Sequence, residues 1–156
     1  MKTISYSFLI FLMVITASCE NENFVISNKL VGKWSYTTEA SPQGIFVYEL
    51  TINDNFSFLS KINSFGIYSG QNNQDLSGWS EFSGSLEEGE NTLIFSAENY
   101  MWWDSFYDMT PVSEESNQTL FDDCTYKVTS NSLELTYITY PADAPVKTKR
   151  KYIRVE

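Results

Sequence analysis

Short runs of alternating apolar and polar residues, separated by clusters of turn residues, fill the chain from about residue 30 onward. In the run Ile45–Ile52, for example, Phe46, Tyr48 and Leu50 occupy every second position, and Asn53-Asp54-Asn55 follows the run. A period of two places alternate side chains on one face of a strand. Asn and Asp favour tight turns because they tolerate left-handed backbone. The pattern therefore predicts an all-β domain.

Most connections between these runs are too short to link parallel strands, so neighbours in sequence are expected to pair antiparallel. An eight-stranded antiparallel up-and-down barrel satisfies this pattern and leaves no free sheet edge. Its interior has room for packed side chains or for one small ligand. We expect the longest loop at residues 104–117. The eight expected strands span residues 32–39, 45–52, 56–69, 76–86, 92–103, 118–129, 133–140 and 146–155.

The start of the first expected strand reads Leu30-Val31-Gly32-Lys33-Trp34. Its Gly-x-Trp pattern, at Gly32 and Trp34, resembles the signature of the lipocalins and the wider calycin group. The resemblance implies a lipocalin-like barrel in which Trp34 lies at the closed base, beneath a basic side chain from near the C-terminus. Arg154 suits that role, with Arg150 as the alternative. A cation over an indole ring is favourable, and the contact would be structural.

The N-terminal segment has one basic residue, Lys2, then an apolar run over residues 8–15 and the small residues Ala17 and Ser18 before Cys19. This order is typical of a secretory signal peptide, and the apolar run is shorter than a membrane span of about 20 residues. The sequence Thr-Ala-Ser-Cys ending at Cys19 resembles the lipobox of bacterial lipoproteins. The alternative is an ordinary signal peptide with an incidental cysteine.

The lipobox resemblance implies that Cys19 carries lipid and becomes the mature N-terminus. It predicts a lipoprotein signal peptide at residues 1–18, a flexible tether at 19–28 and the barrel domain at 29–156. It also predicts a membrane contact through the lipid anchor, at the outer membrane or cell surface of a Gram-negative bacterium. The formal net charge of −10 argues against a nucleic-acid partner.

The sequence offers little catalytic chemistry. It contains no histidine, which removes the commonest general base and ordinary zinc sites. It contains no glycine-rich phosphate loop. The acidic pairs Glu87/Glu88 and Glu114/Glu115 read as solvated turns, and Asp122/Asp123 would point to opposite faces of a strand. We therefore predict a non-enzymatic protein with no cofactor and no metal site.

The segment from Tyr100 to Tyr107 concentrates aromatic residues beside the longest expected loop. Aromatic walls are typical of small-molecule pockets, so we interpret the segment as the border of a cavity for a small hydrophobic or amphipathic ligand. The alternatives are ordinary core packing in a structural or protein-interaction lipoprotein, and stacking on sugar rings in a glycan-binding module. Adjacent tryptophans point to opposite faces, so one of them should face the cavity. The expected ligand-binding residues are Tyr100, Trp102, Trp103, Phe106 and Tyr107.

Overall fold

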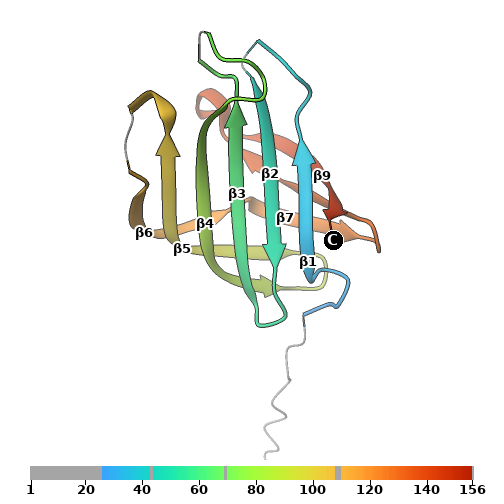
Figure 1. The fold of residues 1–156 in the computed structure, drawn as a ribbon. Coiled ribbons are helices and arrows are strands. Elements are labelled where there is room, and N and C mark those ends of the chain that lie inside the picture. Colours follow the sequence, from blue (N-terminus) through green and yellow to red (C-terminus); the bar gives the residue numbers. More distant parts are fainter. Residues whose placement is uncertain (1–25, 43, 69, 108–109, 156) are drawn as a thin grey trace, which may run out of the picture.

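The computed structural model describes residues 26–42, 44–68, 70–107 and 110–155. Nine strands and two short 3-10 turns make up this part of the chain (Figure 1). The prediction of an all-β domain is confirmed. The elements are β1 (Gly32–Thr37), β2 (Ile45–Ile52), β3 (Ser57–Phe65), β4 (Leu76–Glu88), β5 (Leu93–Asp104), η1 (Ser105–Tyr107), β6 (Val112–Leu120), β7 (Asp122–Val128), β8 (Ser132–Thr139), η2 (Pro141–Asp143) and β9 (Val146–Val155).

The strands form one antiparallel sheet in the order β6-β5-β4-β3-β2-β1-β9-β8-β7. The sheet curls into a half-barrel: β1 to β5 form the near wall in Figure 1, and the orange and red strands form the far wall. A single isolated bridge, Thr92 to Thr125, and a hydrogen bond from Tyr126 N to Asn91 O connect the start of β5 to β7. No ladder joins β6 to β7 among the described residues, and these two strands are the sheet edges.

The prediction of eight strands is wrong, because the expected strand over residues 118–129 is two strands. Leu120 pairs with Phe95 on β5, whereas Asp122 pairs with Ile138 on β8. Phe121 between them has a left-handed φ of 58°, which few residues other than glycine adopt. Its ring packs edge-on against Phe95, with centroids 5.1 Å apart. The chain therefore turns a corner at Phe121 and passes from one edge of the sheet to the other.

The prediction of a long loop at residues 104–117 is also wrong. The segment contains η1 and most of β6 (Val112–Leu120). It has no apolar alternation because β6 is an edge strand, and most of its side chains are exposed. Polar and charged residues on an edge strand discourage pairing with other chains, so the sequence pattern that marks a half-buried strand is missing here.

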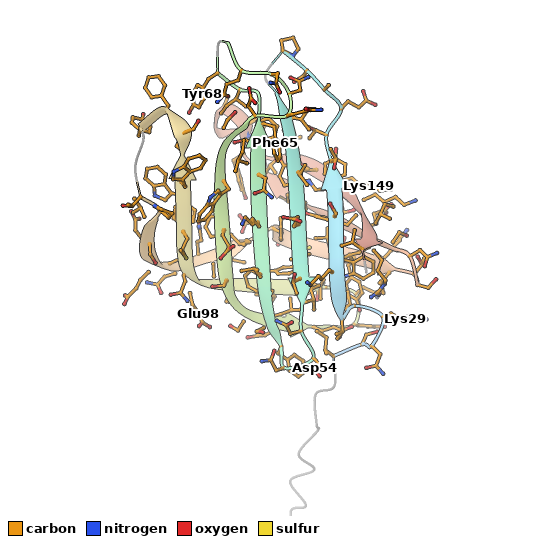
Figure 2. The ribbon with its side chains drawn as sticks, in the orientation of Figure 1. Lys29, Asp54, Phe65, Tyr68, Glu98 and Lys149 are labelled. Atoms are coloured by element: carbon orange, nitrogen blue, oxygen red, sulfur yellow. The ribbon has the colours of Figure 1, made fainter. Side chains whose placement is uncertain are left out.

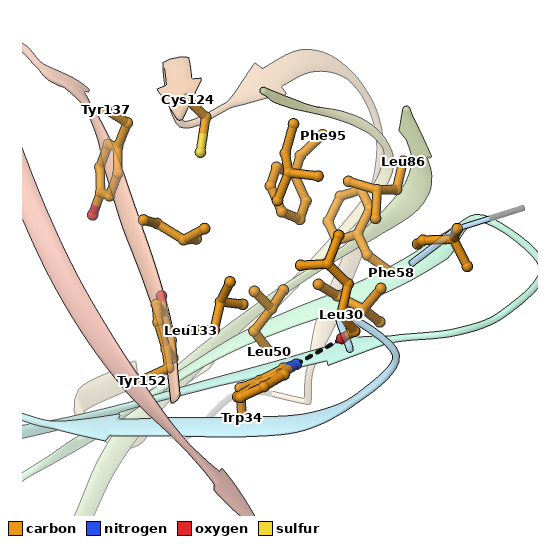
Figure 3. Packing of buried hydrophobic residues seen from close by; sticks show 14 of the residues in the cluster. Leu30, Trp34, Leu50, Phe58, Leu86, Phe95, Cys124, Leu133, Tyr137 and Tyr152 are labelled. Atoms are coloured by element: carbon orange, nitrogen blue, oxygen red, sulfur yellow. Dashed lines mark hydrogen bonds between the residues drawn. The ribbon is translucent and has the colours of Figure 1, made fainter. Parts of the chain in front are cut away.

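The hydrophobic core fills the half-barrel at one end (Figure 3). Phe58 and Phe95 meet edge-on at its centre, with centroids 5.2 Å apart at 87°. Ile26, which precedes β1 and falls within the segment expected to be a tether, is 2% exposed and belongs to this core. The core consists of Ile26, Leu30, Trp34, Leu50, Ile52, Phe58, Leu86, Leu93, Phe95, Ala97, Cys124, Leu133, Leu135, Tyr137 and Tyr152.

We call the filled end the base. The short turns β2–β3, β4–β5 and β7–β8 lie there, together with Lys29 and Asp54 at the bottom of Figure 2. We call the opposite end, marked by Phe65 and Tyr68 in Figure 2, the open end. The connections β1–β2, β3–β4, β5–β6 and β8–β9 lie there. The two ends differ in how the inner side chains are covered.

A bulge in β5 decides which side chains face inward at the open end. Glu98 has no partner on either neighbouring strand, because the pairing steps from Ala97 to Asn99 on both sides. A bulge adds one residue and therefore reverses the alternation beyond it. Tyr100 consequently lies opposite Phe82 of β4, on the inner face that Phe95 occupies before the bulge.

Candidate functional site

Trp34 lies in the base, where its side chain is 0% exposed. Its Nε1 donates a hydrogen bond of 2.9 Å to the carbonyl oxygen of Leu30, drawn as the dashed line in Figure 3. The guanidinium of Arg154 covers the ring, with Cζ 4.0 Å from the centroid. Trp34 thus has a cation above its ring, a satisfied N–H and buried neighbours.

The three nitrogens of the Arg154 guanidinium all donate to backbone carbonyls. Nε donates to Ser130 O at 2.7 Å, Nη1 to Val31 O at 2.8 Å and Nη2 to Lys29 O at 2.5 Å. Gly32 allows this approach: its φ is +143°, and a Cβ there would collide with Arg154 Nη1. The residues of the Gly-x-Trp pattern and Arg154 therefore hold the chain before β1 in place through hydrogen bonds and a cation–π contact.

The inner face continues beyond the core towards the open end, where the described residues bury its side chains only in part. We define the inner aromatic face as Phe46, Ile62, Phe82, Tyr100 and Trp102, all of them half-buried. Cross-strand pairing places them side by side, since Ile62 lies opposite Ser80, and Ser80 lies opposite Trp102. The Phe82 and Tyr100 rings stack, with centroids 4.5 Å apart at 23°.

A hollow of about 240 Å³ lies against this face. Its walls include four of the five residues of the inner aromatic face, and hydroxyl groups interrupt the apolar surface. Apolar walls with a few polar groups suit a small molecule that is itself largely apolar. The lining residues are Phe46, Ile62, Ser64, Gly78, Trp79, Ser80, Tyr100, Trp102, Trp103 and Asp104.

The structure separates the two adjacent tryptophans that the sequence placed in the site. Trp102 lies opposite Ser80 on the inner face, whereas Trp103 lies opposite Trp79 and belongs to the alternate set of side chains. Lys61, from the same outer set, lies over the Trp79 ring, with Nζ 4.8 Å from the centroid. Of the two, Trp102 is the residue of the inner aromatic face.

Phe106 and Tyr107 lie on η1 at the rim of the open end and are 69% and 60% exposed. Asp104 connects this rim to the β3–β4 connection, because it accepts hydrogen bonds from Tyr68 OH at 2.6–2.7 Å and from Phe106 N at 2.8 Å. The hydrogen bond to Asp104 raises the pKa of Tyr68 to about 12. The exposed rings of Phe106 and Tyr107 therefore lie on a rim that hydrogen bonds to Asp104 hold together.

Arg150, the alternative partner expected for Trp34, does not lie over the indole ring. Its Cζ lies 3.6 Å from the ring centroid of Tyr48, 5.5 Å from that of Tyr36 and 5.8 Å from that of Tyr137. Its Nη1 donates a long hydrogen bond of 3.5 Å to Tyr152 OH. Arg150 thus extends from the far wall to the near wall, above the core.

Burial raises the pKa of two tyrosines beside Arg150: that of Tyr137 rises to about 12, and that of Tyr152 is also raised. Neither of these two phenols therefore balances the positive charge of Arg150 as a phenolate at neutral pH. A signal that could have revealed the residue in the sequence is its place on the same alternating face of the last strand as Tyr152 and Arg154.

Other features of the described residues carry no catalytic arrangement. A larger hollow of about 760 Å³ lies where β5 and β7 approach without pairing, lined by threonines, Asp122, Asp123 and Cys124 among others. Cys124 is 3% exposed, and burial raises its thiol pKa to about 12, so it is not a nucleophile at neutral pH. No group of His, Cys, Asp or Glu within the described ranges is arranged to hold a metal ion.

The predicted lipidation site Cys19, the signal peptide and most of the tether lie outside the described residues. Within the described part of the chain, no helix has the length and apolar character to cross a membrane. No protein-family model matches the sequence, and no curated protein and no solved structure matches it either.

Proposed function

We propose that this chain is a non-catalytic binding protein that holds a small hydrophobic or amphipathic molecule on the inner aromatic face at its open end. The observation that carries the proposal is the row Phe46, Ile62, Phe82, Tyr100 and Trp102, which continues the inner face beyond the core and which the described residues bury only in part. Each Å² of apolar surface removed from water is worth about 25 cal/mol. A ligand that covers the row gains this term without rearranging the sheet.

The arrangement of the two ends also supports a lipocalin-like barrel. The tight turns and the Trp34–Arg154 contact lie at the base, whereas the hollow lies on β2 to β5 towards the opposite end. We propose that the half-barrel acts as a lipocalin-like barrel, with its walls held apart by the base and its ligand entering at the open end. Loops on a rigid scaffold commonly carry binding function.

We further propose that the protein is a lipoprotein attached through Cys19 to the envelope of a Gram-negative bacterium, at the outer membrane or cell surface. Ile26 is buried in the base, and Ser27 N donates to Glu88 Oε2 at 2.7 Å. Seven residues of extended chain reach at most about 25 Å, so a lipid on Cys19 keeps the base near the membrane. The open end then faces away from it. Cys19→Ala should abolish labelling by an alkyne fatty acid, and persistent labelling would refute the anchor.

A second candidate function is protein binding at the rim. The exposed rings of Phe106 and Tyr107 favour it, because exposed aromatic residues are enriched at protein interfaces. The hollow of about 240 Å³ is also below the usual range for drug-sized ligands, about 300–1,000 Å³. In this candidate function the partner covers the open end, and no small molecule is needed.

A titration of the purified full-length chain with the neutral apolar dye Nile red tests the small-molecule proposal. We expect saturable binding that quenches tryptophan emission. Trp102→Ala should weaken binding about tenfold, because an aromatic wall is lost. Ile153→Ala is the control: it shortens an exposed apolar side chain on β9 that does not line the hollow, and it should leave the affinity within about twofold. Absence of saturable binding, or equal loss in the two variants, would overturn the proposal in favour of protein binding.

A further inference from the structure

Arg150 is a guanidinium without a carboxylate partner. The ion pairs within the described ranges are Lys61–Glu81 and Lys149–Glu134, and neither involves Arg150. Its one hydrogen bond among the described residues is the 3.5 Å contact with Tyr152 OH. A guanidinium has five N–H donors in a planar fork, so most of its donors are not used by the protein.

The unused donors of Arg150 are not fully buried by the described residues. No buried side-chain nitrogen or oxygen in the described part of the chain lacks a hydrogen-bond partner. Arg150 Nε and Nη2 have no partner in that part of the chain, so neither atom is sealed inside the protein. Water or a ligand atom can reach both of them. Nε and one terminal nitrogen form the edge that binds an oxyanion in a bidentate manner.

Arg150 is continuous with the inner aromatic face. Its guanidinium lies 3.6 Å from the ring centroid of Tyr48, and Tyr48 lies directly opposite Ile62 on β3. Ile62 lines the hollow. From Tyr48 across β3 and β4 to Trp102 on β5 there are three strand spacings of about 4.8 Å, or roughly 14 Å. The cation thus lies at one end of an apolar strip long enough for an extended acyl chain.

The environment makes an anion favourable at this position. A partly buried charge loses hydration, and the three aromatic rings around Arg150 restore only part of that loss. Burial raises the pKa values of Tyr137 and Tyr152, which keeps these two phenols protonated. An oxyanion that accepts two N–H bonds would satisfy donors that now face water, in surroundings of low polarity where such bonds are strong.

We propose that Arg150 is the polar end of the binding site, and that the ligand is an amphipathic molecule with an oxyanion headgroup, such as a carboxylate, and an apolar body along the inner aromatic face. The proposal rests on the proposed function and adds the charge and orientation of the ligand. The headgroup lies between the two walls above the core, at Tyr48, and the apolar body extends across the near wall towards Trp102.

A set of probes with one apolar body and different headgroups tests this assignment: dodecanoate, dodecanol and dodecyltrimethylammonium, each below its micelle concentration, with acetate as the headgroup alone. The full-length chain should bind dodecanoate about tenfold or more tightly than dodecanol, because a charge-assisted hydrogen bond is added. Dodecyltrimethylammonium should bind more weakly than dodecanol. Acetate should not bind measurably, because it lacks the apolar body.

Two variants and one direct signal complete the test. Arg150→Met should reduce the preference for dodecanoate over dodecanol to within about twofold, whereas Arg150→Lys should keep part of the preference. The chain's two arginines give two Nε–H signals in ¹⁵N-arginine-labelled protein. Dodecanoate should shift the Arg150 signal and leave that of Arg154, whose donors are bonded to carbonyls, in place.

The possible results separate the two proposals. If dodecanoate and dodecanol bind equally, or if the Arg150 signal does not shift at saturation, the anionic headgroup is refuted and a neutral apolar ligand remains. If neither probe binds, the small-molecule function itself is refuted. The Nε signal is measured on the unaltered chain, so this result does not depend on whether the variants fold.

Discussion

Two arginines four residues apart on β9 illustrate the difference between the base and the open end. Arg154 covers Trp34 and donates to the carbonyls of Lys29, Val31 and Ser130. Arg150 lies on Tyr48 and donates one long hydrogen bond. The same residue type on the same face of one strand thus has its donors satisfied at the base and largely free near the open end. Two arginines with the same kind of cation–π contact thus differ in the use of their N–H donors, and this difference is the reason that we propose a binding role for Arg150 and not for Arg154.

The largest expected effect is on Trp34 at the base. Trp34→Ala should lower the free energy of unfolding by about 3–5 kcal/mol, since truncating a buried tryptophan leaves a cavity. This is a large part of a typical domain stability of about 5–15 kcal/mol. Urea unfolding followed by circular dichroism measures the loss. Trp102→Ala, at the open end, is the matched control and should cost clearly less. Equal losses would show that the two ends are packed alike.

Replacing each arginine by methionine tests the difference between Arg154 at the base and Arg150 near the open end. Arg154→Met should destabilise the fold by about 1–3 kcal/mol, because three carbonyls lose a charged donor and the indole loses its cation. Arg150→Met should change stability by less than about 1 kcal/mol, since an apolar side chain of similar length replaces a partly buried charge without a counter-ion. Urea unfolding of both variants measures the two changes in the free energy of unfolding.

A double variant gives a further check on the base. Trp34→Ala and Arg154→Met should be non-additive, because each removes the same contact. Additive losses would refute the Trp34–Arg154 interaction as a source of stability. A large loss in Arg150→Met alone would show that the tyrosine-lined arginine is structural.

Alanine substitutions at Gly32 and Gly70 distinguish the cost of backbone strain from the cost of a steric collision. Both have left-handed φ values, +143° and +90°, so an alanine at either position strains the backbone. At Gly32 the new Cβ would also collide with Arg154, whereas at Gly70 no atom lies within 4 Å. Gly32→Ala should therefore cost about 1–2 kcal/mol more than Gly70→Ala, as measured by the difference in urea midpoint. Equal costs would indicate that Arg154 moves aside without loss.

The smallest expected effect is at the rim. The hydrogen bond to Asp104 raises the pKa of Tyr68 from 10 to about 12. A raised pKa in the folded state means that the protonated phenol favours folding below pH 10 and that this contribution is lost as the pH rises towards 12. Tyr68→Phe should remove one late-titrating phenol from an absorbance titration, with little change in stability at neutral pH. Titration of the lost phenol near pH 10 would argue against the Asp104 contact.

Local sequence patterns were sufficient for β2 and for the start of β1. The strand expected at residues 45–52 coincides with β2, and the alternation of Phe46, Tyr48 and Leu50 predicted which side chains share a face. The start of β1 at Gly32 also matches the expected start. These predictions succeed because side-chain alternation is a property of the extended chain itself and does not depend on a distant partner.

The sequence by itself determined the all-β class, the antiparallel pairing of most successive strands and the two faces of the well-patterned strands. Only the tertiary structure decided the corner at Phe121, the polar edge strand β6, and the placement of Trp102 rather than Trp103 on the inner face. The bulge at Glu98 reverses the alternation in β5, and nothing local in the sequence marks it. The role of Arg150 likewise depends on Tyr48, more than a hundred residues away. Alternation is local, whereas pairing register, bulges and the partners of a charge depend on contacts between distant segments of the chain.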